Sequence, residues 1–126
     1  MKSHEHIVER FLKLFHEAQF DEAGKLLSQD CIVYWPNTRE IFTGKNFIVV
    51  NKRYPGRWFN ELVRLLSMDD IVVSVARVYS EDEKQSFYAT SFFKFKDERI
   101  CEITEYWGAI SEPPAWRIKE GLSERH

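Results

Sequence analysis

Apolar residues near the N-terminus recur at the spacing of an amphipathic helix. Ser3 is a favourable N-cap residue, and the positions after it place their apolar side chains on one face. That face consists of Ile7, Phe11, Leu14, Phe15 and Ala18, widened by Val8 and Leu12. We therefore expect a first helix that packs on a broad apolar surface.

Shorter elements follow this helix. Residues 21–28 fit a second helix, and residues 31–35 favour a short strand. Pro36 ends the strand because proline has no N–H for a sheet ladder, and residues 36–39 have the composition of a turn.

A third helix is expected to begin at Thr43. Its inner side would carry Phe47, Val50 and Tyr54. The β-branched run 48–50 also suits a strand, so the pattern alone favours the helix without excluding the alternative. Pro55 ends the helix, since the residue before a proline is disfavoured in the helical region.

From residue 58 the apolar period changes to two. Residues 58–67 fit either a strand or a helix, whereas residues 71–79, 85–95 and 100–110 predict three long strands. The charged connections between these strands are too short for anything but antiparallel hairpins. Helices followed by a meander predict an α+β domain, in which the N-terminal helices cover one face of a curved antiparallel or mixed sheet.

The C-terminal tail begins with a proline-rich segment. Residues 113–116 should be extended, because proline fixes the backbone away from a helix interior. We expect the tail to dock through Trp116 and its last residues to fray.

Length and charge restrict the class of protein. At 126 residues the chain has the size of one domain, spanning residues 1–126, and its 44% hydrophobic content is typical of a globular protein. A net charge of −2 without basic clusters argues against nucleic acid or an anionic membrane as a partner. No apolar run has membrane length and the first residues are too polar for a signal peptide, so a cytoplasmic protein is expected.

Aromatic side chains are abundant, at 15% of the residues. They favour an aromatic-lined cavity or an aromatic dimer interface, and an ordinary aromatic core explains them equally well. Cys31 and Cys101 lack metal-ligand spacing and the four histidines are dispersed, so neither a metal nor a cofactor is predicted.

The strongest candidate for chemistry lies in the last predicted strand. Strict alternation puts Ile103, Glu105 and Trp107 on one face and Glu102, Thr104 and Tyr106 on the other. Whichever face is buried, a carboxylate is buried with it, and an unpaired buried carboxylate costs on the order of several kcal/mol. Glu105, between an isoleucine and a tryptophan, therefore needs a partner, a raised pKa or a water-filled pocket.

Three local sequences carry a family resemblance: the strand end Trp35-Pro36, the helix start Thr43-Gly44-Lys45 and the final strand from Arg99 to Trp107. In this order the chain resembles the nuclear transport factor 2-like superfamily, in particular its SnoaL-like members, over nearly its whole length. The resemblance implies a cone-shaped α+β barrel with a pocket between the sheet and the helices. It leaves the activity open, because the superfamily includes enzymes and non-enzymes.

One member of the superfamily, ketosteroid isomerase, uses an aspartate base with a tyrosine and a neutral aspartic acid. The resemblance places Phe11 at the position of the tyrosine, Trp35 at the base and Ser91 at the second acid. Phenylalanine donates no hydrogen bond, indole takes no proton at neutral pH, and serine is a weaker donor than a carboxylic acid. The isomerase reaction itself is therefore not expected.

The same register implies a pocket wall of alternate residues from three strands: Phe87, Ala89, Ser91, Phe93 and Phe95; Ile103, Glu105 and Trp107; and Val73, Val75 and Arg77. Arg77 and Glu105 would be its two ionisable groups. A direct pair would be structural and would hold Glu105 ionised, whereas an unpaired Glu105 would have the raised pKa that suits a general acid or base. SnoaL-like polyketide cyclases use one pocket carboxylate in this way, without metal or cofactor, to move a proton next to a carbonyl.

Aromatic residues complete the expected site. Tyr34, Tyr54 and Trp58 are expected near the open end, where a tyrosine can bind a substrate oxygen or simply form the wall. The residues expected to contact a ligand are Phe11, Tyr34, Trp35, Tyr54, Trp58, Arg77, Ser91, Ile103 and Trp107, with Glu105 as the catalytic candidate.

Two functions remain open. The first is a pocket protein for a mainly apolar small molecule, on which a carbonyl would suit proton transfer by Glu105. The second is a non-catalytic ligand-binding or dimerisation module with a structural pair of Arg77 and Glu105. The resemblance also implies a homodimer, formed through an outer sheet face that carries Tyr88, Thr90, Phe92, Glu102, Thr104 and Tyr106.

Overall fold

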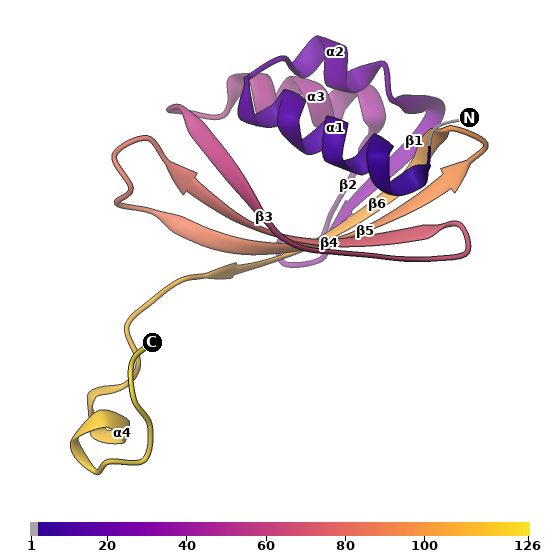
Figure 1. The fold of residues 1–126 in the computed structure, drawn as a ribbon. Coiled ribbons are helices and arrows are strands. Elements are labelled where there is room, and N and C mark those ends of the chain that lie inside the picture. Colours follow the sequence, from indigo (N-terminus) through magenta and orange to yellow (C-terminus); the bar gives the residue numbers. More distant parts are fainter. Residues whose placement is uncertain (1–2) are drawn as a thin grey trace.

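The computed structural model describes residues 3–126, in which helices α1, α2 and α3 lie on one face of a six-stranded sheet (Figure 1). The elements are α1 (His4–His16), α2 (Phe20–Gly24), β1 (Leu27–Trp35), β2 (Glu40–Thr43), α3 (Gly44–Arg53), β3 (Trp58–Met68), β4 (Ile71–Ser80), β5 (Ser86–Lys96), β6 (Arg99–Ala109) and α4 (Ala115–Lys119). The sheet has the order β2-β1-β6-β5-β4-β3 and does not close, so β2 and β3 are its edges. This confirms the expected α+β fold.

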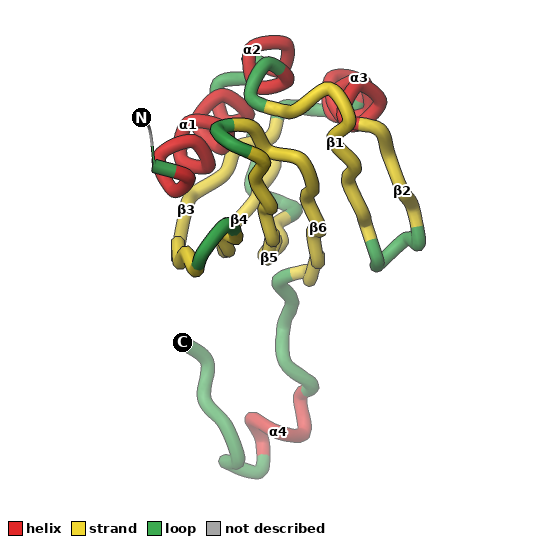
Figure 2. The backbone as a smooth tube through the Cα atoms, turned by 90° about the vertical axis from the view of Figure 1, so that its right-hand side faces the viewer, coloured by secondary structure: helices red, strands yellow, loops and turns green. Residues whose placement is uncertain are grey.

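The first helix forms as its apolar pattern predicts. The backbone N–H of His6 donates to the Ser3 side chain at 3.2 Å, which caps the helix. The buried side chains of α1 are Ile7, Val8, Phe11 and Leu14, and they belong to the same core as Phe47 and Ile48 of α3. Figure 2 shows α1 and α3 on the same side of the sheet. Ala18, expected on the same stripe, lies beyond the helix with a positive φ of 57°.

The predicted second helix is too long. Helix α2 ends at Gly24, and β1 already begins at Leu27, which pairs with Ile100 of β6. Strand β1 runs parallel to β6, and this tertiary pairing outweighs the helical pattern of the local sequence. The strand ends at Trp35, before Pro36, as expected.

Strand β2 is absent from the sequence predictions. It pairs with β1 across the predicted turn of residues 36–39, with Trp35 opposite Glu40. Thr43 then caps α3, accepting a hydrogen bond from the backbone of Asn46 at 3.2 Å. The helix buries Phe47, as predicted, but its second large buried side chain is Ile48, whereas the predicted Val50 is only half-buried.

The long hairpins are confirmed, and residues 58–67 resolve as a strand. Strand β3 pairs with β4 over its whole length, interrupted by a register shift between Leu62 and Arg64. Strands β4, β5 and β6 follow as an antiparallel meander.

The inward face of β4 differs from the one that the resemblance implied. Val72, Ser74 and Ala76 are buried, whereas Val73, Val75 and Arg77, which were expected on the pocket wall, lie on the opposite face. Arg77 makes an ion pair with Glu61 at 3.7 Å, and its guanidinium group lies 4.2 Å from the ring centroid of Tyr79. Both faces of β4 are rich in valine, so alternation alone does not fix its orientation; a charged side chain favours the face that reaches water.

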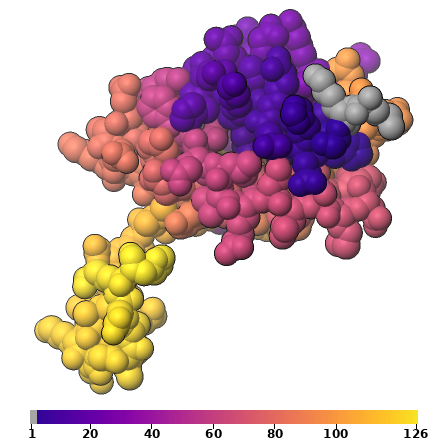
Figure 3. Space-filling view, in the orientation of Figure 1, coloured from indigo at the N-terminus to yellow at the C-terminus, as the bar shows by residue number. Residues whose placement is uncertain are grey.

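The C-terminal tail leaves the sheet on the side opposite the helices and stands clear of the rest of the molecule (Figures 1 and 3). It contains the short helix α4, and the Trp116 side chain is 55% exposed. Trp116 is therefore not docked in the structure, and the expectation that residues 113–116 are extended is wrong for Ala115 and Trp116, which lie in α4. Among the described helices, none is long and apolar enough to cross a membrane.

Candidate functional site

A cavity of about 410 Å³ lies between the inner sheet face and helices α1 and α3. Its wall is largely aromatic and aliphatic, and Glu105 is its one carboxylate among the described residues. The lining includes Phe11, Phe15, Phe20, Trp35, Phe47, Tyr54, Trp58, Ala76, Val78, Phe87, Ala89, Ser91 and Trp107. A concave apolar site with a few directed polar groups is typical of small-molecule binding.

Both carboxylate oxygens of Glu105 are held in place. The Trp35 indole Nε1–H donates to Oε1 at 2.8 Å, and the Ser91 hydroxyl lies 3.1 Å from Oε2. The two donors come from β1 and β5, the strands on either side of β6. Each oxygen keeps a further lone pair for a ligand, so the carboxylate is oriented and still able to take a proton.

Burial is the main influence on the acidity of this group. Glu105 is 9% exposed, and removal from water raises the pKa of its carboxyl above the ordinary value of 4.5. The hydrogen bonds from Trp35 and Ser91 favour the charged form and act in the opposite direction. The net direction is upward, which is the condition for a general acid or base near neutral pH.

Asn37 holds the strand end next to this acid. Its side-chain oxygen accepts a hydrogen bond from the Trp107 N–H at 2.9 Å, and its amide group donates to the Trp107 carbonyl at 3.0 Å. The turn after Trp35 is thereby fixed to β6 beside Glu105. The sequence predicts Asn37 only as part of a turn. The one feature that could have indicated its role is its residue type, because asparagine side chains in turns often bond to the backbone.

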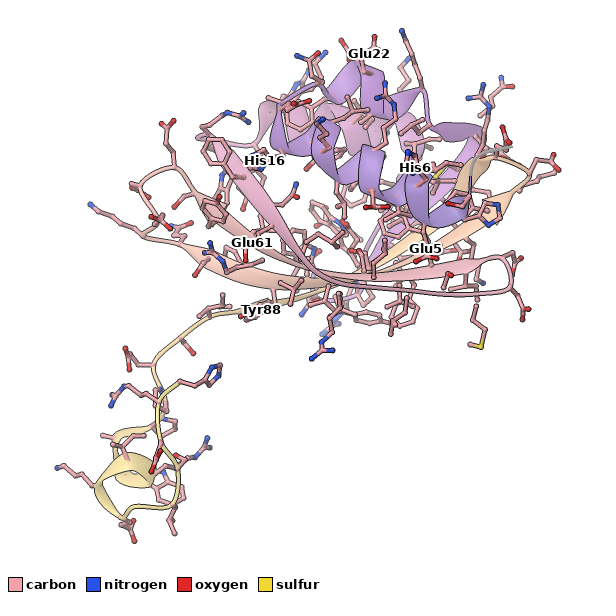
Figure 4. The ribbon with its side chains drawn as sticks, viewed as in Figure 1. Glu5, His6, His16, Glu22, Glu61 and Tyr88 are labelled. Carbon is pink, nitrogen blue, oxygen red and sulfur yellow. The ribbon has the colours of Figure 1, made fainter. Side chains whose placement is uncertain are left out.

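The exposed residues of the cavity lining, here called the rim, lie after α1, in the turn after β1, and between the end of α3 and the start of β3: Ala18, Asn37, Thr38, Lys52, Tyr54 and Gly56. Trp58 donates to the Pro55 carbonyl at 2.9 Å and packs edge-to-face with Tyr54. Arg57 donates to the backbone carbonyl of His16 at 2.8 Å, and His16 Nδ1 accepts from the Asn60 N–H at 3.2 Å. Figure 4 shows His16 at the end of α1 that faces β3. These bonds tie the first helix to the rim.

Polar groups of the cavity lining are available to a ligand. The Tyr54 hydroxyl makes no hydrogen bond to another described residue. The side-chain amides of Asn51 and Asn60 each donate to one backbone carbonyl, of Phe47 and Leu12 respectively, and each retains a second N–H.

The cysteines and acids give no sign of other chemistry. Cys31 is buried, and burial raises the pKa of its thiol to about 12, so it is a poor nucleophile. Within residues 3–126, no three His, Cys, Asp or Glu side chains gather in a way that could hold a metal ion.

A model of the SnoaL-like domain matches residues 8–103, which is most of the chain. The chain belongs to the SnoaL-like domain family. No protein of curated function matches the sequence.

Solved structures resemble this SnoaL-like domain closely in fold. A candidate ketosteroid isomerase from Kribbella flavida is 22% identical, with a TM-score of 0.83 over 98% of this chain and 89% of that one. A candidate SnoaL-like polyketide cyclase from Shewanella putrefaciens is 11% identical, with a TM-score of 0.72 over 97% and 86%. An LEH-like epoxide hydrolase from M. tuberculosis is 18% identical, with a TM-score of 0.70 over 94% and 88%. At these identities the similarity establishes the fold and assigns no reaction.

Six of the nine residues expected to contact a ligand line the cavity of this SnoaL-like domain with Glu105: Phe11, Trp35, Tyr54, Trp58, Ser91 and Trp107. The other three do not. Arg77 and Tyr34 lie on the outer sheet face, and Ile103 is fully buried in the core. The direct pair of Arg77 with Glu105 is therefore wrong, and the carboxylate has neutral donors in place of a cation.

Next to the site, Ser74 adds a second hydroxyl to a polar row across three strands. Ser74 is opposite Ser91, and Ser91 is opposite Glu105. The Ser74 side chain is 1% exposed, and its hydroxyl has no hydrogen-bond partner among the described residues. A buried polar group without a partner is destabilising.

Replacing Ser74 by Ala is expected to raise the free energy of unfolding by about 1 kcal/mol, because it removes this unpaired hydroxyl. Ser91→Ala is the matched control on the neighbouring strand, and it should lower stability because it removes a donor to Glu105. Urea denaturation of the three proteins measures both values. A loss of stability in Ser74→Ala would show that its hydroxyl does have a partner in solution.

Proposed function

We propose that this protein binds a mainly apolar, carbonyl-containing small molecule and transfers a proton on it through Glu105, without a cofactor. One observation carries the proposal: the cavity is apolar apart from a few groups, and an oriented carboxylate with an upward-shifted pKa lies in its wall. An acid placed in this way is costly to bury and contributes nothing to packing.

The chemistry follows from the groups present. The Glu105 carboxylate would take a proton from the carbon next to the ligand carbonyl, and the C–H electron pair would move into an enolate. The protonated acid would then return the proton to the same or a nearby carbon. Trp35, which can only donate, keeps Oε1 in position throughout, while Ser91 can donate to the carboxylate or accept from the acid.

The cavity lining supplies groups for the ligand oxygen. The Tyr54 hydroxyl and the second N–H of Asn51 or Asn60 are the donors that would stabilise an enolate there. The similarity to candidate isomerase and cyclase structures supports this reaction class, and the similarity to an epoxide hydrolase shows that the fold also accommodates another one.

Deuterium exchange provides a direct test. Small bicyclic ketones such as 2-indanone and 2-tetralone are incubated with the protein in D2O, and proton NMR follows the loss of signal at the carbon next to the carbonyl. We expect exchange faster than the buffer rate for a ketone that also binds. Binding of these ketones without faster exchange would favour a ligand carrier over an enzyme.

A second candidate function, dimerisation, is favoured by the outer sheet face. An apolar row crosses all six strands through directly opposed residues: Ile41, Tyr34, Thr104, Phe92, Val73 and Leu66. Four of them are large and exposed, at 63% for Ile41, 37% for Tyr34, 40% for Phe92 and 67% for Leu66. Figure 4 shows Tyr88, a neighbour of this row, on the face away from the helices. A continuous apolar surface of this kind is typical of a protein interface.

The dimer is tested by light scattering at micromolar concentration. We expect the mass of two chains, and we expect Phe92→Asp to shift the protein towards the monomer because it places a charge in the middle of the apolar row. Lys96→Asp, at the exposed end of the same strand, is the control and should remain a dimer. A monomeric wild type would contradict the dimer and would leave the proposal for Glu105 intact.

A further inference from the structure

Residues 111–126, here called the C-terminal arm, project from the end of β6 on the side of the outer sheet face (Figures 1 and 2). Among the described residues, the hydrogen bonds of the arm join arm residues to each other. The Arg117 N–H donates to Pro114, the Glu120 N–H donates to Trp116, and the Arg125 side chain donates to Glu112 at 2.8 Å. Figure 3 shows the arm standing away from the body of the molecule.

An arm of this kind cannot hold its own conformation in water. Helix α4 has five residues and no side-chain cap, far below the length at which isolated helices are stable. The arm nevertheless carries large apolar side chains, with Trp116 at 55% and Leu122 at 68% exposed. A short helix that presents a tryptophan and a leucine to solvent needs a surface to pack on.

The arm's own domain is poorly placed to provide that surface. Pro113 and Pro114 follow Glu112 directly, and each proline fixes its own φ and restricts the residue before it. This stiff segment directs the chain away from the sheet it has just left, as Figure 1 shows. A sharp return to the same sheet face would require a turn that consecutive prolines do not favour.

We propose that the C-terminal arm packs on a second copy of the chain, so that the two subunits of the dimer exchange arms across their outer sheet faces. This inference rests on the dimer proposed above. The arm starts at the sheet face that carries the exposed apolar row, so a copy facing that sheet comes within its reach. Trp116, Ile118 and Leu122 are the apolar side chains that it would bury there.

An exchanged arm would add to the area of the dimer interface. Strands β3, β4, β5 and β6 have 10 or 11 residues each and are therefore about 35 Å long, so at a spacing of about 4.8 Å they present a flat face on the order of 700 Å². A stable interface buries about 800 Å² on each partner, so the sheet face is close to the size that a dimer needs. The arm would enlarge this interface and supply a tryptophan, which is among the residues that contribute most to interfaces.

The charges allow this association. The arm carries three acids and three bases, Glu112, Glu120, Glu124, Arg117, Lys119 and Arg125, so it is neutral apart from the chain end. On the outer face, Arg77 pairs with Glu61 and Lys94 pairs with Glu102 at 3.3 Å. The arm and the outer sheet face therefore do not repel each other, and burial of their apolar side chains would provide the free energy of association.

A photo-crosslinking residue at position 116 of the full chain tests the exchange directly. With benzoylphenylalanine in place of Trp116, irradiation is expected to give a covalent product of twice the chain mass, with the bond mapped by mass spectrometry to the outer face of β3–β6. Products confined to a single chain would overturn the proposal, because they would place the arm on its own domain.

A pair of variants gives an independent measurement. Trp116→Ala is expected to raise the dimer dissociation constant by about tenfold or more in sedimentation equilibrium, whereas Lys119→Ala, on the same short helix, should leave it unchanged. A dimer that Trp116→Ala leaves as tight as the wild type would overturn the arm exchange alone. A monomeric wild type would overturn the exchange and the dimer together, and neither result bears on Glu105.

Discussion

Glu105→Gln is expected to abolish proton exchange on a bound ketone, with a loss of about 10²-fold to 10⁴-fold or more, while making the protein more stable at neutral pH. The amide cannot take a proton from carbon, so general base catalysis is lost. The amide oxygen can still accept from Trp35, and its N–H₂ can donate to Ser91, so the local structure is retained. The variant also has no charge to bury.

The stability difference between the two proteins should depend on pH in a defined direction. Burial raises the pKa of Glu105 in the folded protein, so the folded state holds this proton to a higher pH than the unfolded chain does. The free energy of unfolding of the wild type therefore falls as pH rises from the ordinary value of 4.5 through the folded-state pKa. Each unit of difference between the folded-state and unfolded-state pKa lowers the free energy of unfolding at neutral pH by about 1.4 kcal/mol. Glu105→Gln has no such loss, because the amide does not ionise.

Urea denaturation between pH 4 and pH 9 measures this difference, with deuterium exchange as the activity assay. Glu102→Gln is the matched control, because Glu102 lies on the same strand, faces outward and pairs with Lys94. It should leave the exchange rate unchanged and should not reproduce the pH-dependent gain in stability. Unchanged exchange in Glu105→Gln would refute the role of this acid, and a constant stability difference across the pH range would contradict its raised pKa.

Part of this site was predictable because the family resemblance supplied a register and strand alternation then fixed which residues share a face. Alternation alone left Glu102 and Glu105 as equal candidates for burial. The register implied by the resemblance puts Ser91 and Glu105 on the inner face of β5 and β6, as the structure does. The first helix and the end of β1 at Trp35 followed from the cap at Ser3 and from Pro36.

The error in β4 has a physical cause. Its valines occur on both faces, because the outer face of this sheet is itself partly apolar, so periodicity gives no direction. The register taken from the family resemblance then placed Arg77 inside. The local rule that a charged side chain favours water would have placed Ser74 and Ala76 inside, as the structure does.

The hydrogen bond from Trp35 to Glu105 lay beyond any local pattern. The two residues are 70 positions apart, and they meet because β1 inserts beside β6 in parallel, a pairing that depends on the whole chain. The sequence did show that Glu105 needed a partner. It could not show that the partner is an indole N–H, because the choice of neighbour is set by the strand order.

The volume of the cavity depends on two alanines, and replacing one of them is expected to have the second large effect. Ala76 and Ala89 are directly opposite each other on β4 and β5, both are buried, and both line the cavity. Their small side chains leave the room that larger residues would fill. Ala89→Leu adds three carbon atoms into this space and should weaken ligand binding by about 100-fold, by exclusion and without loss of a polar contact.

Prodan, an uncharged naphthyl ketone whose fluorescence shifts in apolar surroundings, is a suitable probe for this measurement. Ala109→Leu makes the same change at the exposed end of β6 and should bind prodan as the wild type does. Because the leucine fills a cavity, Ala89→Leu should keep or increase the thermal stability of the protein. Wild-type affinity in Ala89→Leu would place the ligand outside the cavity, whereas a large loss of stability would show that the cavity has no room for the side chain. Weak binding by a protein that stays folded is the result expected if the hollow beside Glu105 is the site.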